Sequence, residues 1–290
     1  MGEVLRSGGQ ILIDQLVAQG VERAYCVPGE SYLAALDAMC NAPIELTVCR
    51  QEAGAAIMAL TEGRLTGRPG ICFVTRGPGA TNAAHGLHIA EHDSAPMILF
   101  IGQVDRAMMG RGAFQEMDYR ALFASTTKLA TEIKTAAQIP EIVHRAFHIA
   151  MQGRPGPVAI ALPEDMLTEM AAVENAPRAE PVPIWPGLTQ MAELQKMLWA
   201  AKSPIAILGG GGWTKRASAA FTRFAERFDL PVTGSFRRSS AFDGEHDNFA
   251  GEVGLSINPK LKARVEAADL VLLVGGRMSE ASAQSYTLFG

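Results

Sequence analysis

Short apolar segments alternate with longer helical stretches over the first 165 residues of the chain. Runs rich in Val, Ile, Leu and Cys, bounded by glycine, proline and polar residues, predict buried strands. The predicted strands are 24–27, 44–49, 71–75, 96–101 and 158–162. Between them, apolar residues recur at helical spacing, most clearly at about 3–19 and 139–151. Strands that alternate with helices are typical of a parallel sheet covered by helices, so we predict a doubly wound α/β domain.

The composition changes after residue 165. Residues 166–187 are rich in Pro, Ala and Glu, and their closely spaced prolines predict an extended linker. The alternating pattern then resumes, with helices at about 189–201 and 216–228 and strands at 205–208 and 270–274. We therefore predict a domain at 1–165, a linker at 166–187 and a Rossmann-like domain at 188–290. Too few strands are predicted in the second domain to close such a sheet, so we expect it to be partial.

Composition narrows the class of protein. A chain of 290 residues suits two domains, and 48% hydrophobic with 19% charged residues indicates a globular protein. The net charge of −4 lacks the basic excess that nucleic acid or anionic lipid would require. No signal-like or membrane-spanning apolar run occurs, so we expect a cytoplasmic protein without membrane partners. The cysteines lack metal-site spacing, and we expect four unpaired buried thiols: Cys26, Cys40, Cys49 and Cys72.

Four polar or glycine-rich turns follow predicted strands or precede helices. They are Val27-Pro28-Gly29-Glu30, Arg50-Gln51-Glu52, the segment 75–82 and the end of the irregular stretch 102–115 with Glu116. In open parallel sheets ligands bind outside the carboxyl ends of the strands, and the first three turns would share that edge. Glu52 is the candidate acid there, because it opens a helix beside small residues.

These turns together resemble the pyrimidine-binding domain of thiamine-diphosphate enzymes of the acetolactate synthase type. The likeness extends over essentially the whole chain. Each motif alone is weak, but their order and spacing are specific. The motifs are Gly29, Arg50-Gln51-Glu52-Ala53-Gly54-Ala55-Ala56, Gly77-Pro78-Gly79-Ala80-Thr81-Asn82, Gly102-Gln103-Val104, Phe114-Gln115-Glu116 and Gly153-Arg154-Pro155-Gly156-Pro157-Val158.

The resemblance implies that Glu52 hydrogen-bonds N1′ of the cofactor's aminopyrimidine, and that the resulting proton shift removes the thiazolium C2 proton. A 2-keto acid is then attacked and carbon dioxide leaves, with the cofactor as electron sink. By the same likeness Gly29, Pro78 and Asn82 bind the cofactor. Phe114 and Gln115, with Gly29, line the substrate pocket, and Gln115 joins Glu52 as a catalytic residue. The implied activity is that of a lyase or transferase.

The resemblance also implies what this sequence does not hold. Members of the family carry a third domain, whose Gly-Asp-Gly to Asn-Asn motif binds Mg²⁺ and the cofactor's diphosphate, and no Gly-Asp-Gly occurs here. We therefore expect no metal ligand in this chain, which would be inactive alone. The family's active site lies between subunits, which implies a homodimer or tetramer. Arg76 stands where much of the family has a small residue, and Val27 where some members have Tyr, so the substrate can differ.

Other interpretations remain open. The chain could be one subunit of a split enzyme, or a non-catalytic nucleotide-binding module that uses Gly209–Gly212. That run fits the GxGxxG pattern poorly, and Ser235–Gly251 matches flavin-binding members only loosely, which leaves FAD as an open alternative. Histidines four apart can bind metal, but no third ligand type stands nearby, so we expect ordinary helix faces at His85, His88, His92, His144 and His148.

Overall fold

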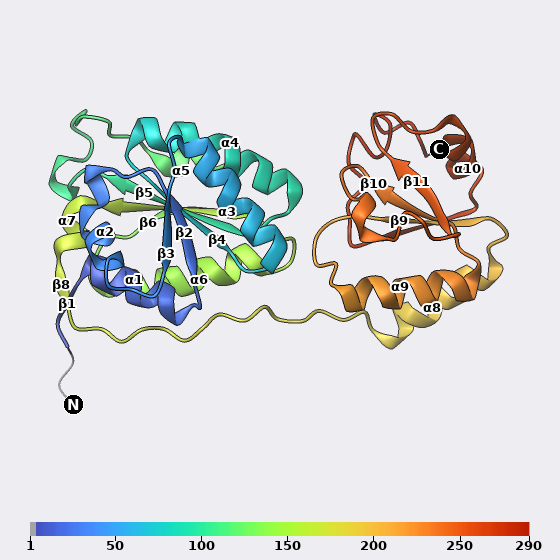
Figure 1. Cartoon of the computed structure of the whole chain (residues 1–290), viewed down its shortest axis with the longest axis horizontal. Coiled ribbons are helices and arrows are strands. Elements are labelled where there is room, and N and C mark those ends of the chain that lie inside the picture. Colours follow the sequence, from blue (N-terminus) through green and yellow to red (C-terminus); the bar gives the residue numbers. More distant parts are fainter. Residues whose placement is uncertain (1–3, 290) are drawn as a thin grey trace. The chain divides into compact units, whose positions relative to one another are not determined.

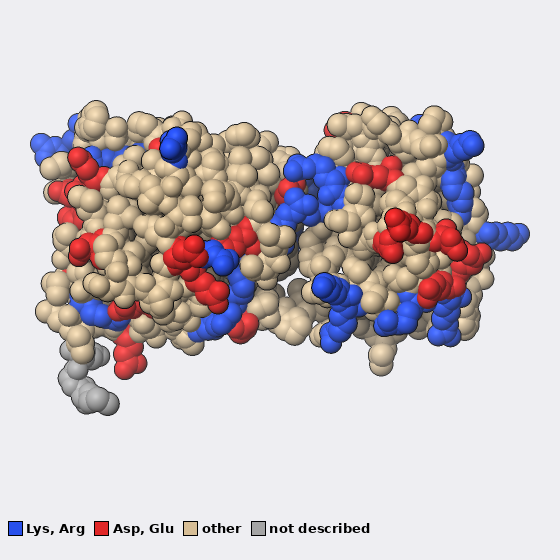
Figure 2. Space-filling view, viewed as in Figure 1, with Lys and Arg blue, Asp and Glu red and all other residues tan. Residues whose placement is uncertain are grey.

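The computed structural model describes residues 4–289. The chain divides into two compact units, 1–182 and 183–290, each built around its own sheet (Figure 1). Among residues 4–289, no helix is both long enough and apolar enough to cross a membrane. Acidic and basic side chains are interspersed on the visible face of each unit (Figure 2).

A six-stranded, wholly parallel sheet forms the centre of unit 1. The strand order is β3-β2-β4-β5-β7-β6. The bounds are Arg23–Cys26 for β2, Glu45–Val48 for β3, Gly70–Val74 for β4, Met97–Gln103 for β5, Leu129–Glu132 for β6 and Pro157–Pro163 for β7. Every residue of β4, β5 and β7 is buried, as expected for central strands with both faces covered. The predicted doubly wound α/β class is confirmed.

Helices cover both faces of this sheet because successive strand residues point to opposite sides. Ile71 and Phe73 of β4 pack with α1, α2 and α6, whereas Cys72 and Val74 pack with α3, α4 and α5. The helices of unit 1 are α1 Gly8–Ala18, α2 Leu33–Met39, α3 Glu52–Thr66, α4 Gly77–Asp93, α5 Tyr119–Phe123, α6 Ile139–Met151 and α7 Glu164–Thr168, with single turns at η1 Glu30–Tyr32, η2 Arg106–Met108 and η3 Ala136–Gln138.

The first helix begins later than the predicted residue 3. Its amino end is fixed by Ser7, whose side chain accepts from the Gln10 amide while the Gln10 side chain accepts from the Ser7 amide. This reciprocal capping fixes Gly8 as the first residue of the helix. The preceding residues Arg6–Ser7 form β1, which pairs antiparallel with β8 at Met170–Ala171. Residues 1–3 lie outside the described part of the chain.

Part of the predicted linker is fixed on unit 1. Two buried glutamines, Gln15 on α1 and Gln19 just after it, exchange hydrogen bonds with the linker backbone. Gln15 bonds with Ala176, and Gln19 bonds with Pro177 and Ala179. Ala179 is fully buried. Backbone groups that are buried need hydrogen-bond partners, and here the side-chain amides of the two glutamines supply them. Residues 176–179 therefore follow α1 closely without forming a helix or strand.

A second parallel sheet, β11-β10-β9-β12, forms the centre of unit 2. Its elements are α8 Leu188–Ala200, β9 Pro204–Leu208, α9 Lys215–Phe228, β10 Val232–Ser235, η4 Ser239–Ala241, β11 Phe249–Val253, α10 Pro259–Glu266 and β12 Leu270–Val274. The sequence prediction found β9 and β12 but not β10 and β11. Both missed strands contain glycine and polar residues, whose strand propensity is low, yet all four residues of β10 are buried.

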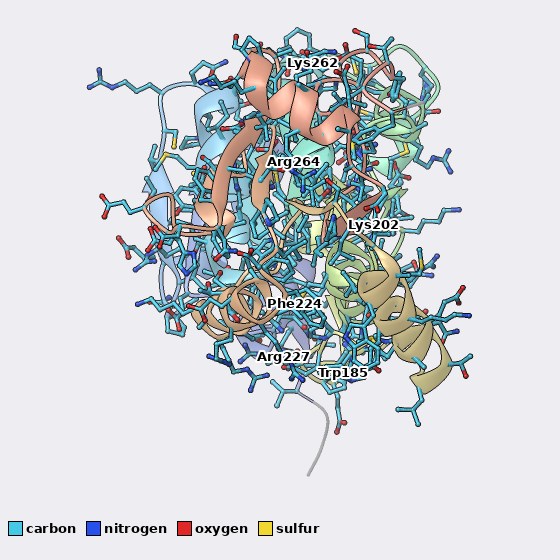
Figure 3. The ribbon with its side chains drawn as sticks, turned by 90° about the vertical axis from the view of Figure 1, so that its right-hand side faces the viewer. Trp185, Lys202, Phe224, Arg227, Lys262 and Arg264 are labelled. Carbon is cyan, nitrogen blue, oxygen red and sulfur yellow. The ribbon has the colours of Figure 1, made fainter. Side chains whose placement is uncertain are left out.

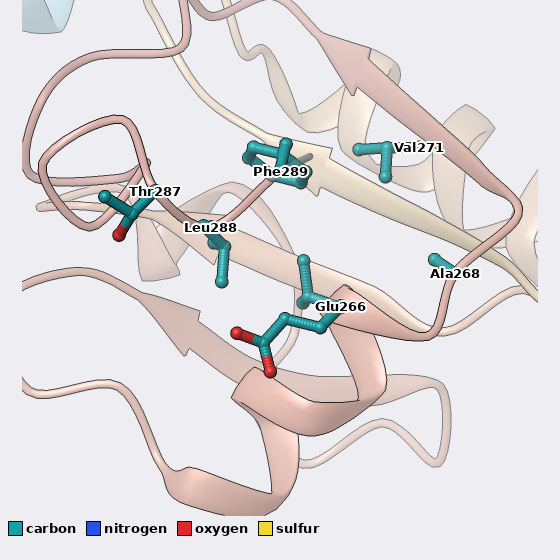
Figure 4. A pocket seen from close by; sticks show the side chains of 7 residues that line it. Glu266, Ala268, Val271, Thr287, Leu288 and Phe289 are labelled. Atoms are coloured by element: carbon teal, nitrogen blue, oxygen red, sulfur yellow. The ribbon is translucent and has the colours of Figure 1, made fainter.

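Helices α9 and α10 pack against the sheet of unit 2. Phe224 and Arg227 lie on α9, and Lys262 and Arg264 on α10 (Figure 3). Arg264 donates from Nη2 to the Pro204 carbonyl at 2.7 Å, which fastens α10 to the start of β9. A pocket of about 340 Å³ lies near the end of α10 (Figure 4) and holds none of the predicted site residues; it is lined by Val265, Glu266, Ala268, Val271, Thr287, Leu288 and Phe289.

Candidate active site

The carboxyl edge of the unit 1 sheet brings three of the predicted turns together. Cys26 near the end of β2 is in register with Val48 of β3 and with Phe73 of β4, and all three strands are parallel. The turns after them hold Gly29, Glu52 and the segment 77–79. The adjacency that the sequence predicted from strand direction is therefore present in the structure.

Glu52 is the first residue of α3. The side chain of Gln51 accepts a hydrogen bond from the Gly54 amide at 2.9 Å, so Gln51 caps the helix. This cap starts the helix at the residue that follows it, and Glu52 is held half-buried at the sheet edge. A carboxylate at a helix amino end is also favoured by the helix dipole.

The Glu52 carboxylate is fixed by one neighbour and open on its other side. Asn82 of α4 donates from Nδ2 to Glu52 Oε2 at 2.9 Å. A Cβ atom built at Gly79 would lie 3.6 Å from Oε1. Among the residues that the structure describes, Oε1 has no hydrogen-bond partner. The pair therefore presents one oriented, free carboxylate oxygen beside the Gly-Pro-Gly turn, where Pro78 is exposed in the first turn of α4.

Gly29 permits close packing of two turns. A Cβ atom at this position would lie 2.5 Å from Cβ of Thr75. The hydroxyl groups of Ser31 and Thr75 are 3.1 Å apart and hydrogen-bonded, which joins the turn after β2 to the turn after β4. The φ of Gly29 is −152°, an ordinary extended value, so glycine is required here by space and not by backbone conformation.

The loop that carries Phe114 and Gln115 meets the same turn through its backbone. The Gly77 amide donates to the Gln115 carbonyl at 3.1 Å. Phe114 is 77% exposed, and within residues 4–289 neither its side chain nor that of Gln115 forms a hydrogen bond or ring contact with Glu52. The structure thus brings Glu52, Asn82, Gly79 and Gly29 to one edge, and joins Gln115 to it by one backbone hydrogen bond.

Arg76 has a partner that sequence reasoning missed. Its guanidinium group pairs with Glu164, the residue that follows β7, two strands away across the sheet edge. Nε of Arg76 is buried, and among the described residues it has no hydrogen-bond acceptor. The only available signal was that Glu164 also follows a strand, because the pair is separated by 88 residues in sequence.

The cysteines near the sheet edge are protonated thiols. Burial is the main cause that raises the pKa of Cys26 to about 11 and raises the pKa of Cys72 well above its usual value. Neither is therefore a thiolate nucleophile at neutral pH. The expectation that all four cysteines are buried was wrong, because Cys40 is exposed at the end of α2 and Cys49 is only half-buried.

Four of the six histidines form two ring pairs, one on α4 and one on α6. The rings of His88 and His92 on α4 are 4.6 Å apart, and those of His144 and His148 on α6 are 4.7 Å apart. His144 Nδ1 lies 2.8 Å from the Pro177 carbonyl oxygen. Between residues 4 and 289 no group of three or more His, Cys, Asp or Glu side chains is arranged to hold a metal ion.

The Gly209–Gly212 run follows β9 at the carboxyl edge of the second sheet. Gly210 and Gly212 have φ of +68° and +77°, which favour glycine. A Cβ atom at Gly210 would lie 1.7 Å from the Gly275 carbonyl oxygen, so the turn packs tightly on the turn after β12. Trp213 Nε1 donates to the Gly209 carbonyl at 2.8 Å and closes the run.

Comparison with known proteins agrees with the resemblance. Two family descriptions match the chain: "Thiamine pyrophosphate enzyme, N-terminal TPP binding domain" at residues 6–122, and "Thiamine pyrophosphate enzyme, central domain" at residues 191–289. The first covers the sheet edge with Glu52 and Asn82, and the second covers the sheet of unit 2.

Individual relatives align along nearly the whole chain. The acetolactate synthase isozyme 2 large subunit of Escherichia coli is 31% identical over 277 residues, which are 94% of this chain and 50% of that protein. The acetolactate synthase of Bacillus subtilis is 33% identical over 94% of this chain and 48% of its own length. The acetolactate synthase large subunit of Haemophilus influenzae is 34% identical over 94% and 49%.

The chain spans about half the length of the curated relatives it matches. The chain belongs to the thiamine pyrophosphate enzyme family, of which it carries the N-terminal and central domains.

Proposed function

We propose that the protein is a thiamine-diphosphate-dependent decarboxylase or carboligase that acts on a 2-keto acid. The names of its relatives, acetolactate synthases, support this proposal. One observation carries this proposal: the Glu52 carboxylate is oriented by Asn82 through one oxygen and leaves the other free beside Gly79. A free carboxylate oxygen next to a position without a side chain fits the protonated ring nitrogen of an aminopyrimidine.

The residues present suit the cofactor, which when bound supplies an electron sink for the carbanion left by decarboxylation. Glu52 would hold the ring-nitrogen proton, and Asn82 would keep the carboxylate in the plane that this contact needs. Pro78 would contact the aminopyrimidine, and Gly29 would allow the backbone to approach the reacting centre closely. Gln115 and Phe114 would line the pocket of the keto acid. Mg²⁺ and the diphosphate would be held by a domain outside this sequence.

We further propose that a second subunit covers this edge, so that the protein works as a homo-oligomer. Apolar side chains of the elements that carry or flank Glu52 face solvent: Val48 at the end of β3 is 60% exposed, Met58 on α3 42% and Phe114 in the loop after η2 77%. A hydrogen bond between a carboxylate and a protonated ring nitrogen is stronger when water is excluded from it. Cover of these side chains by a partner subunit would provide that exclusion and would bury an otherwise costly apolar surface.

The proposal is tested by exchange of the thiazolium C2 proton for deuterium. The protein carrying this chain is loaded with thiamine diphosphate and Mg²⁺, and C2 exchange is followed by NMR after acid quench. Glu52→Gln keeps the size of the side chain but cannot take the proton, so we expect exchange to slow at least a hundredfold. Glu174→Gln, at an exposed glutamate, should exchange like the unchanged protein. Unaltered exchange in Glu52→Gln would refute the role of Glu52.

A second candidate function concerns unit 2. The positive φ angles of Gly210 and Gly212 at the carboxyl end of β9 support a phosphate-bearing ligand such as FAD or ADP, because such turns expose backbone amides. Calorimetric titration with FAD, ADP and NAD tests this possibility. Binding that is lost in Gly212→Ala, where an added Cβ atom meets nothing within 4 Å, would support the turn as the site, and absence of heat with all three ligands would end the proposal.

A further inference from the structure

The loop at residues 110–116 is held by a single carboxylate. Glu116 accepts from the Gly110 amide through Oε1 at 2.5 Å, and from the Ala113 amide through Oε2 at 3.1 Å. The Glu116 amide itself donates to the Ala113 carbonyl at 3.0 Å. Each of the two carboxylate oxygens of Glu116 therefore accepts a hydrogen bond from the backbone of this loop.

This stretch of chain has an intrinsically unfavourable backbone. Gly110 and Gly112 have φ of +75° and +69°, and Gln115, which is not glycine, has φ of +63°. Residues 109–118 form no helix or strand, so no regular ladder of hydrogen bonds stabilises them. A loop with a left-handed glutamine needs another source of order, because this conformation is sparsely populated by residues other than glycine.

The carboxyl side of the loop is anchored independently of Glu116. Gly77 donates to the Gln115 carbonyl at 3.1 Å, and Nε2 of the buried Gln103 donates to the Met117 carbonyl at 2.9 Å. Among residues 4–289, the Glu116 carboxylate is the only group that accepts a hydrogen bond from the Gly110 amide on the amino side of the loop. Hydrogen bonds from the amides of Gly110 first and Ala113 second lower the pKa of Glu116, so the group is ionised at neutral pH and its bonds are charge-assisted.

We propose that Glu116 is a positioning residue, which closes the loop 110–116 on its own carboxylate and so presents Phe114 and Gln115 toward the keto acid. The role of these two residues rests on the proposed function, whereas the closure of the loop rests on the hydrogen bonds alone. Loss of the carboxylate would leave the Gly77–Gln115 bond intact and would release the amino half of the loop, including Phe114.

Amide hydrogen exchange of the full chain tests the closure directly. In the unchanged protein the amides of Gly110 and Ala113 should be protected. In Glu116→Gln we expect them to exchange about tenfold faster, because an amide group accepts more weakly and places a donor against one of the two amides. Glu141→Gln, at an exposed glutamate in the first turn of α6, is the matched control and should leave them unchanged.

A conservative variant separates loop closure from general loss of structure. Glu116→Asp keeps the charge but is one methylene shorter, so it should restore protection at one of the two amides. Faster exchange confined to residues 110–116 supports the proposal. Equal protection in Glu116→Gln and the unchanged protein overturns it, as does faster exchange throughout unit 1 in both Glu116 variants.

Steady-state kinetics with pyruvate, thiamine diphosphate and Mg²⁺ test the positioning of substrate. We expect Glu116→Gln to raise KM for pyruvate about tenfold with less than a threefold change in kcat, and Glu116→Asp to recover part of the difference. An unchanged KM with a loosened loop overturns the positioning role. Absence of turnover in the unchanged protein, assayed with its diphosphate-binding domain present, contradicts the proposed function instead, and the exchange result still decides the closure of the loop.

Discussion

In the described part of the chain, three carboxylates each accept hydrogen bonds from two backbone amides. Glu116 holds the amides of Gly110 and Ala113, and Asp118 accepts from two amides at the start of α5. Asp269 accepts from the amides of Lys202 at 2.7 Å and Ser203 at 2.9 Å, and so connects the turn before β12 to the turn before β9. Each carboxylate replaces a regular hydrogen-bond ladder where the chain must turn.

The Asp269 contact predicts a pH dependence of stability. The amides of Lys202 first and Ser203 second lower the pKa of Asp269 in the folded protein. Such a group stabilises the fold above its unfolded pKa of about 3.9, and this stabilisation is lost as the pH falls through the lower folded pKa. Asp269→Asn should therefore be less stable than the unchanged protein at neutral pH and should lose less stability in acid.

Urea unfolding of both proteins at about pH 7 and about pH 3 measures this difference. Glu245→Gln, at an exposed position of unit 2, serves as the control for removal of one negative charge. Parallel stability profiles for Asp269→Asn and the unchanged protein would contradict the assigned contact.

Residues of the site were predictable to different degrees. Gly29 lies in the turn after β2, and Glu52 and Asn82 lie near the starts of α3 and α4, which follow β3 and β4, so strand direction alone placed them at one edge. The Glu52–Asn82 bond and the Arg76–Glu164 pair were not predictable from local patterns, because their partners are separated by 30 and 88 residues. The left-handed φ of Gln115 was also hidden, since glutamine gives no signal for it.

Helix α3 lies against the sheet at a distance that only glycine allows. A Cβ atom at Gly63 would lie 1.9 Å from the Pro96 carbonyl oxygen, which itself accepts from the Gly70 amide. A Cβ atom at Gly54 on the same helix would meet nothing within 4 Å. These two glycines therefore separate the effect of close packing from that of helix propensity.

Gly63→Ala should destabilise unit 1 by about 1–3 kcal/mol through overpacking. Gly54→Ala should be neutral or should stabilise it by up to about 1 kcal/mol, because alanine is the better helix former. Thermal unfolding of the two variants beside the unchanged protein provides the comparison. An equal effect of both substitutions would be inconsistent with close contact between α3 and the Pro96 carbonyl.

Elements were predicted well where burial is continuous and poorly where it is local. The strands β4, β5 and β7 are buried throughout and were found within a few residues, and α6 was found with its observed bounds. The edge strand β6 is half-buried at each residue and was missed. Strand β10 was missed because its sequence, Val-Thr-Gly-Ser, carries no apolar run and owes its burial to its neighbours in the sheet.

The whole molecule consists of two units with separate sheets and cores, and both match domains of the thiamine pyrophosphate enzyme family. Unit 1 forms the Glu52–Asn82 pair within itself. The chain covers about half the length of each curated relative described above. The activity that we propose for the whole protein requires a bound cofactor and a partner subunit.

A crystal structure of the protein with bound thiamine diphosphate would show whether Glu52 binds the aminopyrimidine. The distance to measure joins the nearer Glu52 carboxylate oxygen and N1′ of the aminopyrimidine. We expect a hydrogen bond of about 2.6–3.0 Å to the oxygen that Asn82 leaves free. A carboxylate turned to open solvent, with the aminopyrimidine bound elsewhere, would contradict it.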